Sequence, residues 1–285
     1  MKDIEIDWKK VGLVIENALE EDLGSGDITT DAIFSSGDNC EAIIIAKQEG
    51  VIAGIPMVKK VFQILDPAAS FSQELNDGDH VEEGQEILRI KALVRAVLSG
   101  ERLALNLLQR MSGIATVTSK YVRALKGLDT KILDTRKTAP GLRILDKYAV
   151  SVGGGRNHRF GLFDAVLIKD NHIKFAGSIS KAVDIIRDKY QARYEIEVET
   201  STLDEVKEAL KAEADIIMLD NMSVQMIKEA LSVIDGKAIT EASGGITLDS
   251  VREIAETGVD FISVGAITHS APALDISLYM VYLPS

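Results

Sequence analysis

Cysteine is almost absent from this sequence of 285 residues, which contains only Cys40. A single thiol cannot close a disulfide within the chain, so nothing in the sequence indicates an oxidising compartment. There is also no cluster of cysteine and histidine with the spacing of a zinc site. The longest apolar runs, such as residues 42–46, fall far short of the roughly 18 residues that a membrane-spanning helix requires. These absences exclude a disulfide-stabilised domain, a zinc module and a membrane-spanning protein.

Positive charge is in short supply as well. The chain has 32 Lys and Arg residues against 44 Asp and Glu residues, a net charge of −12 and an isoelectric point near 4.9. Nucleic acids and anionic membranes attract basic surfaces, so neither is an expected partner. Residues 1–7 alternate charged and aliphatic side chains and lack the basic and apolar regions of a signal peptide. We therefore expect a cytoplasmic protein.

Apolar residues make up 46% of the chain and charged residues 27%, as in soluble globular proteins. Residues 1–22 and 93–125 carry apolar side chains at helical spacing, which predicts two helices. Between them, 24–30 is a loop rich in turn residues, and short apolar runs at 41–46, 51–54 and 86–90 predict a small sheet. These features predict an N-terminal domain that mixes helices and strands. The apolar stripe of its second helix consists of Leu103, Leu107, Leu108, Met111, Ile114 and Ala115.

From residue 131 the pattern becomes a regular alternation of strands and helices. The predicted strands are 131–135, 165–169, 194–199, 215–219, 238–242 and 261–265. The predicted helices between them are 140–152, 179–190, 202–213, 223–234 and 247–257. Such repeated units predict a parallel sheet of the α/β class, either closed as a barrel or open and doubly wound. Only six strands are evident, whereas a standard barrel has eight.

Polar or small residues follow every one of these predicted strands. In parallel α/β folds the substrate binds at this edge of the sheet, so these residues are candidates for a site. They are Thr135, Arg136 and Lys137 after the first strand, residues 169–172 after the second, Glu199 at the third, Asp220 and Asn221 at the fourth, Ser243, Gly244 and Gly245 at the fifth, and Gly265 and Ala266 at the sixth.

The segment 131–174 is locally basic, with nine Lys and Arg residues and four Asp residues. A basic pocket in an acidic protein suits the capture of a small polyanion. Arginine offers a planar fork to a carboxylate or phosphate, and lysine offers a compact charge. The candidates are Arg136, Lys137, Arg143, Arg156, His158, Arg159 and Lys169.

Two turns of small residues, 243–245 and 264–266, follow the last two predicted strands. Glycine lets the backbone approach a ligand closely, and the N-terminus of a helix presents N–H groups to an anion. In βα barrels these last loops commonly hold a phosphate. The glycine run 153–155 is equally compatible with an anion-binding loop and with a flexible helix end.

Alternating glutamates, Glu195, Glu197 and Glu199, are expected on one face of the third strand. Such a row inside a barrel requires Lys or Arg partners or a metal ion. Asp220 on the next strand could share a divalent cation with Glu199, because hard cations prefer oxygen ligands. For the nearby histidines 158 and 172, an acid–base role and a structural role both stay open.

Motifs along nearly the whole chain are also recognisable as a set. They are residues 135–143 (TRKTAPGLR), 147–150 (KYAV), 153–159 (GGGRNHR), 167–173 (LIKDNHI), 197–199 (EVE), 218–221 (MLDN), 241–246 (EASGGI) and 263–266 (SVGA), with 21–22, 26–30, 101–102 and 104–106 upstream. With these motifs the sequence resembles the quinolinate phosphoribosyltransferase family, also called nicotinate-nucleotide pyrophosphorylase (carboxylating).

The resemblance implies an N-terminal α/β sandwich domain over residues 1–110 and an incomplete, six-stranded parallel α/β barrel over 111–270. The segment 271–285 would pack back on the first domain. The implied reaction converts quinolinate and 5-phosphoribosyl diphosphate to nicotinate mononucleotide, carbon dioxide and pyrophosphate in NAD biosynthesis. Its implied cofactor is Mg²⁺.

The resemblance also implies roles for individual residues. The catalytic residues would be Lys137, Glu199 and Asp220, of which the two acids would also hold the ribose hydroxyls and Mg²⁺. Quinolinate would be bound by Arg136, His158, Arg159 and Lys169, together with Arg102. Thr135 would also bind substrate, and Lys137 would face the diphosphate or quinolinate. The 5-phosphate would bind at Ser243, Gly244, Gly245, Val264, Gly265 and Ala266.

Arg102 precedes the predicted barrel, and in the family this arginine comes from the second subunit. The resemblance therefore implies a homodimer in which each site borrows Arg102 from its partner. The apolar neighbours of Arg102 are expected to be numerous enough for both core and subunit contacts; they are Leu103, Leu105, Leu107 and Leu108.

Three alternatives stay open from the sequence alone. A related phosphoribosyltransferase associated with molybdenum-transport genes would have another substrate. A lyase of the barrel class could form a Schiff base on Lys137 or Lys169. A non-catalytic ligand-binding protein is the third.

Overall fold

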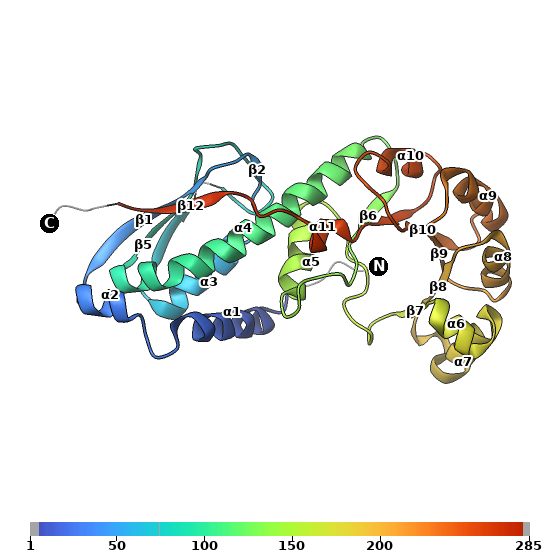
Figure 1. Ribbon diagram of the computed structural model, residues 1–285, viewed down its shortest axis with the longest axis horizontal. Helices are drawn as coiled ribbons and strands as arrows, with labels where there is room; N and C mark the ends of the chain where they lie inside the picture. Colours follow the sequence, from blue (N-terminus) through green and yellow to red (C-terminus); the bar gives the residue numbers. More distant parts are fainter. Residues whose placement is uncertain (1–5, 74, 282–285) are drawn as a thin grey trace. The chain divides into compact units, whose positions relative to one another are not determined.

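The computed structural model describes residues 6–73 and 75–281, which form two compact units (Figure 1). One unit, the barrel unit, contains residues 120–137 and 155–266. The other, the N-terminal unit, contains the described residues before 120 together with 138–154 and 267–281. The units therefore divide the chain differently from the single boundary expected near residue 110, because 138–154 returns to the N-terminal unit.

The N-terminal unit contains a four-stranded antiparallel sheet in the order β12-β1-β5-β3. Its strands are β1 (Asn39–Ala46), β3 (Ser70–Gln73), β5 (Glu86–Leu93) and β12 (Ile276–Val281). Alternate side chains of β1 are buried, as expected for a strand with one face on a core. The segment after residue 270 supplies β12, which lies beside β1 (Figure 1). The short strands β2 (Gly50–Val51) and β4 (His80–Val81) pair separately.

The helices of this unit include α1 (Trp8–Leu23), α2 (Ile28–Ile33), α3 (Ile55–Leu65) and most of the long α4 (Val94–Ala124). The predicted apolar stripe of α4 is confirmed, since all six of its residues are buried. Part of the predicted loop 24–30 is instead the start of α2, because Asp27 accepts hydrogen bonds from the N–H groups of Thr29 and Thr30 and so caps this helix. Residues 1–5 of the predicted first helix lie outside the described residues.

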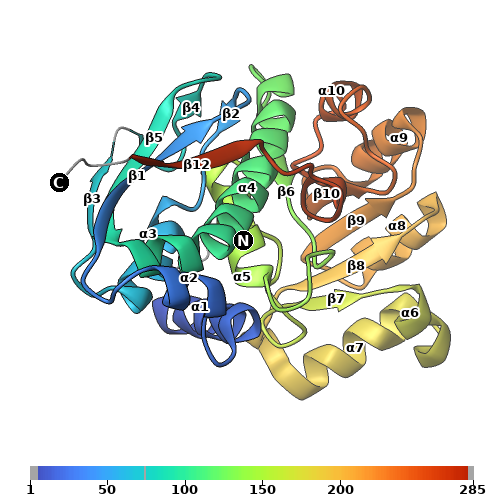
Figure 2. The ribbon, with the colours of Figure 1, turned by 60° about the vertical axis from the view of Figure 1, so that its left-hand side comes forward.

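The barrel unit is built on a six-stranded parallel sheet in the order β6-β11-β10-β9-β8-β7 (Figure 2). This order confirms the predicted fold class. Because β11 pairs with β6, while β6 and β7 are the two edges, the sheet is a barrel left incomplete between β6 and β7. The strands are β6 (Lys131–Leu133), β7 (Val166–Ile168), β8 (Ile196–Thr200), β9 (Ile216–Asp220), β10 (Ile239–Ser243) and β11 (Phe261–Ser263).

Helices connect successive strands on the outside of this sheet (Figure 2). They are α7 (Ile179–Tyr190), followed by the short η1 (Gln191–Arg193), then α8 (Leu203–Lys211), α9 (Val224–Ile234) and α10 (Val251–Ala255). After β11 comes α11 (Ala266–His269). Among the described residues, no helix is both long and apolar enough to cross a membrane.

Three helix starts in the second half of the chain differ from the sequence pattern, and one of them is α10, which begins at Val251 where a helix from 247 was predicted. The predicted helix 140–152 begins only at α5 (Arg143–Val152), because Gly141 adopts a left-handed φ of +79° just before it. A further helix, α6 (Asp170–Ala176), follows β7 directly, where a strand end and loop were expected. It is capped by a local hydrogen bond in which the N–H of Lys169 donates to Nδ1 of His172 at 2.9 Å.

A short segment after residue 155 lies along the open edge of β6. Arg156 forms a parallel bridge with Leu133: its N–H donates to the carbonyl of Ile132 at 2.8 Å, and its own carbonyl accepts from Asp134 at 3.1 Å. The Asp134 carboxylate is buried and accepts hydrogen bonds from the Asn157 side chain at 2.6 Å and from the next backbone N–H at 2.8 Å. The segment thus takes the place of a missing strand and brings residues 157–159 to the barrel interior.

Candidate active site

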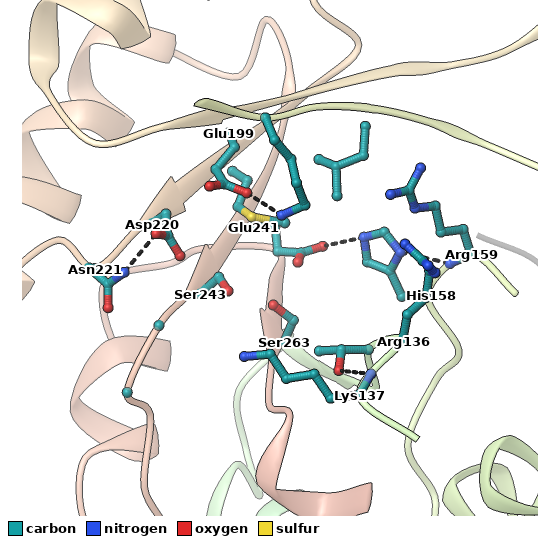
Figure 3. Close-up of a pocket in the computed structure, with 16 residues that line it drawn as sticks. Arg136, Lys137, His158, Arg159, Glu199, Asp220, Asn221, Glu241, Ser243 and Ser263 are labelled. Carbon is teal, nitrogen blue, oxygen red and sulfur yellow. Dashed lines mark hydrogen bonds and ion pairs between the residues drawn. The ribbon is translucent and has the colours of Figure 1, made fainter. Parts of the chain in front are cut away.

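A cavity of about 600 Å³ opens at the carboxyl ends of the six parallel strands (Figure 3). Every strand contributes a lining residue at or just after its carboxyl end, where the sequence predicted a site. The lining residues that the sequence analysis named are Thr135, Arg136, Lys137, His158, Arg159, Lys169, Glu199, Asp220, Asn221, Ser243, Gly244 and Gly245. Those that it did not name as site residues are Leu167, Met218, Glu241 and Ser263.

Arg143 and Arg156 of the basic segment and residues 170–172 are not part of this lining, and neither are four residues to which the resemblance gave a binding role. Arg102 is an exposed residue of α4 in the N-terminal unit. The N–H of Val264 donates to the carbonyl of Leu133 at 2.9 Å, so it is already used within the sheet. Gly265 and Ala266 follow at the start of α11.

Two arginines and a lysine from the basic segment meet in the cavity. Arg159 is half-buried, and its Nη1 donates to the carbonyl of Ala165 at 3.1 Å. Burial lowers the pKa of Arg159, and the nearby positive charge of Arg136 lowers it further. Two guanidinium groups that repel each other in one cavity form a site that an anion would stabilise. The lysine is Lys169, and its ammonium group forms an ion pair with Glu199.

Two carboxylates, Glu199 and Asp220, lie at the ends of the adjacent strands β8 and β9 (Figure 3). One oxygen of Asp220 accepts a hydrogen bond from the side-chain amide of Asn221 at 2.6 Å. Oxygen ligands on neighbouring strands fit a hard divalent cation such as Mg²⁺, which keeps waters or phosphate oxygens as its other ligands. Glu199 and Asp220 are therefore the residues that could hold Mg²⁺, and the Mg²⁺ site stays a prediction.

The turn after β10 brings backbone to the cavity wall. Gly244 has a φ of +97° and Gly245 a φ of +61°, a conformation that favours glycine. A side chain at Gly244 would collide with Asn221, whose N–H donates to the carbonyl of Ser243 at 2.8 Å. Glycine is thus required for the loops after β9 and β10 to approach each other, and the exposed backbone can meet an anion.

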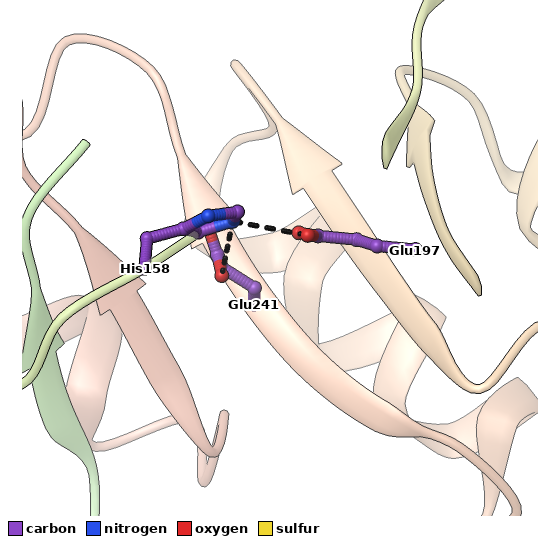
Figure 4. A group of neighbouring side chains, drawn as sticks. All are labelled: His158, Glu197 and Glu241. Carbon is purple, nitrogen blue, oxygen red and sulfur yellow. Dashed lines mark ion pairs between the residues drawn. The ribbon is translucent and has the colours of Figure 1, made fainter. Parts of the chain in front are cut away.

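A buried cluster of His158, Glu197 and Glu241 forms part of the cavity wall and interior (Figure 4). The Nε2 atom of His158 lies 3.0 Å from Oε2 of Glu197 and 3.7 Å from Oε2 of Glu241. Burial raises the pKa of Glu241 to about 8, and the negative charge of Glu197 contributes to this rise. The raised pKa favours the neutral form of Glu241 at pH 7.

The predicted row of three glutamates is only partly present. Glu197 is buried and Glu199 lines the cavity, but Glu195 precedes β8 and is exposed at the amino end of the sheet. The row was wrong at this position because β8 begins at Ile196, one residue too late to include Glu195. Glu241 was missed, although an acidic residue in the middle of a predicted buried strand was a signal that could have found it.

Two open questions from the sequence receive structural answers. His172 is exposed and caps α6, and it does not line the cavity. The glycine run 153–155 follows α5, where a Cβ on Gly153 would lie 2.6 Å from the carbonyl oxygen of Ala115. Close packing of α5 against α4 therefore explains the first of these glycines.

Glu241→Gln should flatten the pH dependence of stability. Between pH 4.5 and 8 the unfolded chain releases a proton that native Glu241 retains, so the free energy of unfolding falls as pH rises. The slope from one such group is at most about 1.4 kcal/mol per pH unit. Glutamine has no proton to release, so the free energy of unfolding of the variant should rise relative to that of the wild type as the pH increases towards 8. Urea unfolding at a series of pH values measures this, with the exposed Glu195→Gln as control; parallel profiles for Glu241→Gln and the wild type would contradict the assignment.

The chain matches two family models along most of its length. Residues 27–112 match "Quinolinate phosphoribosyl transferase, N-terminal domain", and residues 114–279 match "Quinolinate phosphoribosyl transferase, C-terminal domain". A probable nicotinate-nucleotide pyrophosphorylase (carboxylating) of Bacillus subtilis is 47% identical over 258 residues, which cover 90% of this chain and 89% of that protein. A quinolinate phosphoribosyltransferase (decarboxylating) of Nicotiana tabacum is 45% identical, and the aligned region covers 93% of this chain and 81% of that protein.

Solved structures resemble the fold equally well. NadC from Streptococcus pyogenes is 40% identical in sequence, and its crystal structure superposes with a TM-score of 0.94. The superposition covers 99% of this chain and 100% of that chain. The nicotinate-nucleotide pyrophosphorylase from Francisella tularensis is 41% identical, with a TM-score of 0.91 and 99% of each chain covered. The incomplete barrel and the antiparallel sheet therefore occur together in these proteins as they do here.

Proposed function

This chain belongs to the quinolinate phosphoribosyltransferase family, and we propose that the cavity at the strand ends is where it carries out that family's reaction. The enzyme is a pentosyltransferase of NAD biosynthesis, a nicotinate-nucleotide pyrophosphorylase (carboxylating). Quinolinate receives a phosphoribosyl group from 5-phosphoribosyl diphosphate and loses carbon dioxide, while pyrophosphate leaves.

The convergence of Arg136 and Arg159 on one cavity is the observation that carries the proposal. Quinolinate has two adjacent carboxylates, and two guanidinium forks together with the Lys169 ammonium supply matching charge. Burial and then the charge of Arg136 lower the pKa of Arg159, and an anion between the arginines would offset both. Thr135 is placed to support this wall, because its Oγ1 accepts a hydrogen bond from the Lys137 N–H at 3.0 Å.

The opposite wall suits the phosphoribosyl donor. Glu199 and Asp220 would hold the ribose hydroxyls and Mg²⁺, and their negative charge would favour the cationic ribosyl group of the transition state. When bound, Mg²⁺ supplies charge neutralisation to the departing diphosphate. Lys137 would contact the same diphosphate.

The 5-phosphate would bind to backbone N–H groups of the turn at Ser243, Gly244 and Gly245. Gly265 and Ala266 stay part of this proposal, whereas the N–H of Val264 is engaged with Leu133. The phosphate and the two carboxylates of quinolinate would then lie on different walls of one cavity, with the reacting ribose between them.

Decarboxylation needs no covalent adduct with the protein. Once ribosylated, the positive ring nitrogen stabilises the electron pair that stays on C2 as carbon dioxide departs, and C2 then takes up a proton to give nicotinate mononucleotide. Lys169 is ion-paired with Glu199, and an ammonium group in an ion pair has no lone pair with which to form a Schiff base. For Lys169 the Schiff-base alternative therefore has no support in this geometry.

A homodimer in which Arg102 of one subunit reaches the cavity of the other is also proposed. Arg102 is exposed, as a residue that serves a partner must be. The leucines expected to contact that partner are buried within their own chain, so they do not support the interface. Exposed apolar residues lie instead on α1 and α2, namely Trp8, Leu13, Ile28 and Ile33, and such residues suit a subunit contact. The cytoplasm stays the expected compartment.

Purified protein should form nicotinate mononucleotide from quinolinate, 5-phosphoribosyl diphosphate and Mg²⁺. With quinolinate labelled at its 2-carboxylate, labelled carbon dioxide should be released in an amount equal to the nicotinate mononucleotide formed. Nicotinate, which lacks the 2-carboxylate, should be a poor replacement because one of the charge-assisted contacts is lost. Turnover of nicotinate at a similar rate, or no turnover of quinolinate, would contradict the proposed function.

Removal of divalent cations should abolish turnover. Excess chelator leaves the departing diphosphate without its principal counter-charge, and added Mg²⁺ should restore the rate. Asp220→Asn should raise the Mg²⁺ concentration needed for half-maximal rate, whereas the exposed control Asp249→Asn should not. Full activity in excess chelator would exclude the Mg²⁺ role of Glu199 and Asp220.

A further inference from the structure

His158 is held at three points in the barrel interior. Its backbone N–H donates to the Asp134 carboxylate at 2.8 Å. Its Nδ1 accepts a hydrogen bond from the backbone N–H of Arg159 at 2.7 Å. Its Nε2 faces Glu197 and Glu241. Only 9% of the residue is exposed, so its ring has a fixed orientation.

The contact at Nδ1 decides the protonation state of the ring. A backbone N–H can only donate, so Nδ1 of His158 must present a lone pair and carries no proton. A doubly protonated imidazolium would place two donors 2.7 Å apart at this point. The ring is therefore neutral, and its one proton is on Nε2, which lies 3.0 Å from Oε2 of Glu197 and 3.7 Å from Oε2 of Glu241 (Figure 4).

The same contact argues against a metal ion in this cluster, although the candidate ligand atoms lie within 4.8 Å of one another. A histidine that binds a metal through one nitrogen normally donates a proton from the other. Nδ1 of His158 is an acceptor and cannot donate. In place of a metal ion, a proton held by Glu241, whose pKa is raised, reduces the negative charge of the two glutamates in this cluster.

We propose that His158 is a neutral positioning residue that fixes Arg159 and does not itself bind a substrate carboxylate. This differs from the role that the sequence resemblance implied, since both ring nitrogens already face protein groups. His158 anchors the Arg159 backbone, and the carbonyl of Ala165 anchors the guanidinium at Nη1. Arg159 is thereby held at both ends. The proposal rests on the proposed function in taking quinolinate as the ligand.

Nitrogen NMR of the histidine rings tests the protonation state directly. The chain has four histidines, and the signals of His158 can be assigned by their absence in His158→Asn. At neutral pH they should report a proton on Nε2 only, and saturation with quinolinate or addition of Zn²⁺ alone should leave that state unchanged. A proton gained at Nδ1 on quinolinate binding would overturn the proposal, and a Zn²⁺-induced shift would replace it with a metal site.

Steady-state kinetics tests the action through Arg159. Arg159→Ala should raise the KM for quinolinate roughly 10- to 150-fold, the loss of one charge-assisted contact. His158→Ala should raise the same KM, while His158→Asn, which keeps an acceptor for the next N–H, should restore most of the affinity. The double variant His158→Ala/Arg159→Ala should be no weaker than Arg159→Ala alone, because one residue acts through the other.

Additive losses in this cycle would mean that His158 contacts quinolinate itself and would overturn the proposal. If His158→Ala does not fold, comparison of His158→Asn with His158→Asn/Arg159→Ala completes the cycle, and the NMR measurement on the wild type is unaffected. Failure of the proposed function is a different outcome, because the wild type would then neither turn over quinolinate nor show any quinolinate-dependent signal.

Discussion

Lys137→Met should lower the turnover number roughly 100- to 1,000-fold, the usual effect of removing one group that stabilises transition-state charge. Lys137 lies on the loop after β6 and lines the cavity across from Glu199 and Asp220 (Figure 3). Negative charge develops on the diphosphate as its bond to the ribose breaks, so a cation there acts more strongly on the transition state than on bound substrate. The loss should therefore fall on the turnover number and leave the KM for quinolinate little changed.

A matched control for this variant lies on the strand that precedes the Lys137 loop. Lys131 is exposed at the amino end of β6, away from the strand ends that form the cavity. Lys131→Met removes the same charge from the other end of this strand–loop segment and should leave turnover unchanged. If Lys137→Met raises only the KM, the residue binds ground-state substrate and the catalytic role is wrong.

The architecture could be predicted because its signal is local and repeated. Strand-like runs alternate with amphipathic helices from residue 131 onwards, and each run is confirmed as a strand within two residues at either end. Parallel strands bring their carboxyl ends to one edge, so residues as distant in sequence as Thr135 and Ser243 were placed in one site before any contact was known. The alternation of strands and helices, together with the rule that parallel strands share one carboxyl edge, is sufficient to predict the location of the site.

What the sequence could not show depends on contacts with no local pattern. The segment 156–159 runs beside β6 through a single bridge, too short to produce a recognisable strand signal. The cluster of His158, Glu197 and Glu241 joins a loop to two strands that are not neighbours. Its chemistry follows from burial and proton positions, and neither is visible in a motif. The resemblance could name His158, but only the contact at Nδ1 shows what that ring can do.

The face of α4 near Arg102 shows a different limit of the sequence pattern. Leucines at helical spacing indicate burial, but they do not indicate whether the covering surface belongs to the same chain or to another. Here all four leucines are buried by their own chain, and the exposed side chains nearby are Arg102 and Asn106. The dimer proposal therefore depends on Arg102 and on the exposed apolar residues of α1 and α2, and a functional test is more direct than any surface argument.

Mixing Arg102→Ala with Lys137→Met should restore activity that neither variant has alone. If each cavity takes Arg102 from the partner subunit, a mixed dimer contains one cavity with both defects and one with neither. A random one-to-one mixture after subunit exchange should then reach about a quarter of the wild-type rate. Exchange can be followed with two distinguishable affinity tags, and the rate measured as nicotinate mononucleotide formed.

The matched control combines two defects of the same cavity. Lys137 and Asp220 both line it from the barrel unit of one chain. At a Mg²⁺ concentration too low for Asp220→Asn to turn over, mixing Lys137→Met with Asp220→Asn leaves every cavity defective and should restore nothing. Recovery in the first mixture and none in the second would assign Arg102 to the partner's site. If exchange is demonstrated and both mixtures stay as inactive as their parents, Arg102 acts within its own chain, and the shared-site dimer is wrong.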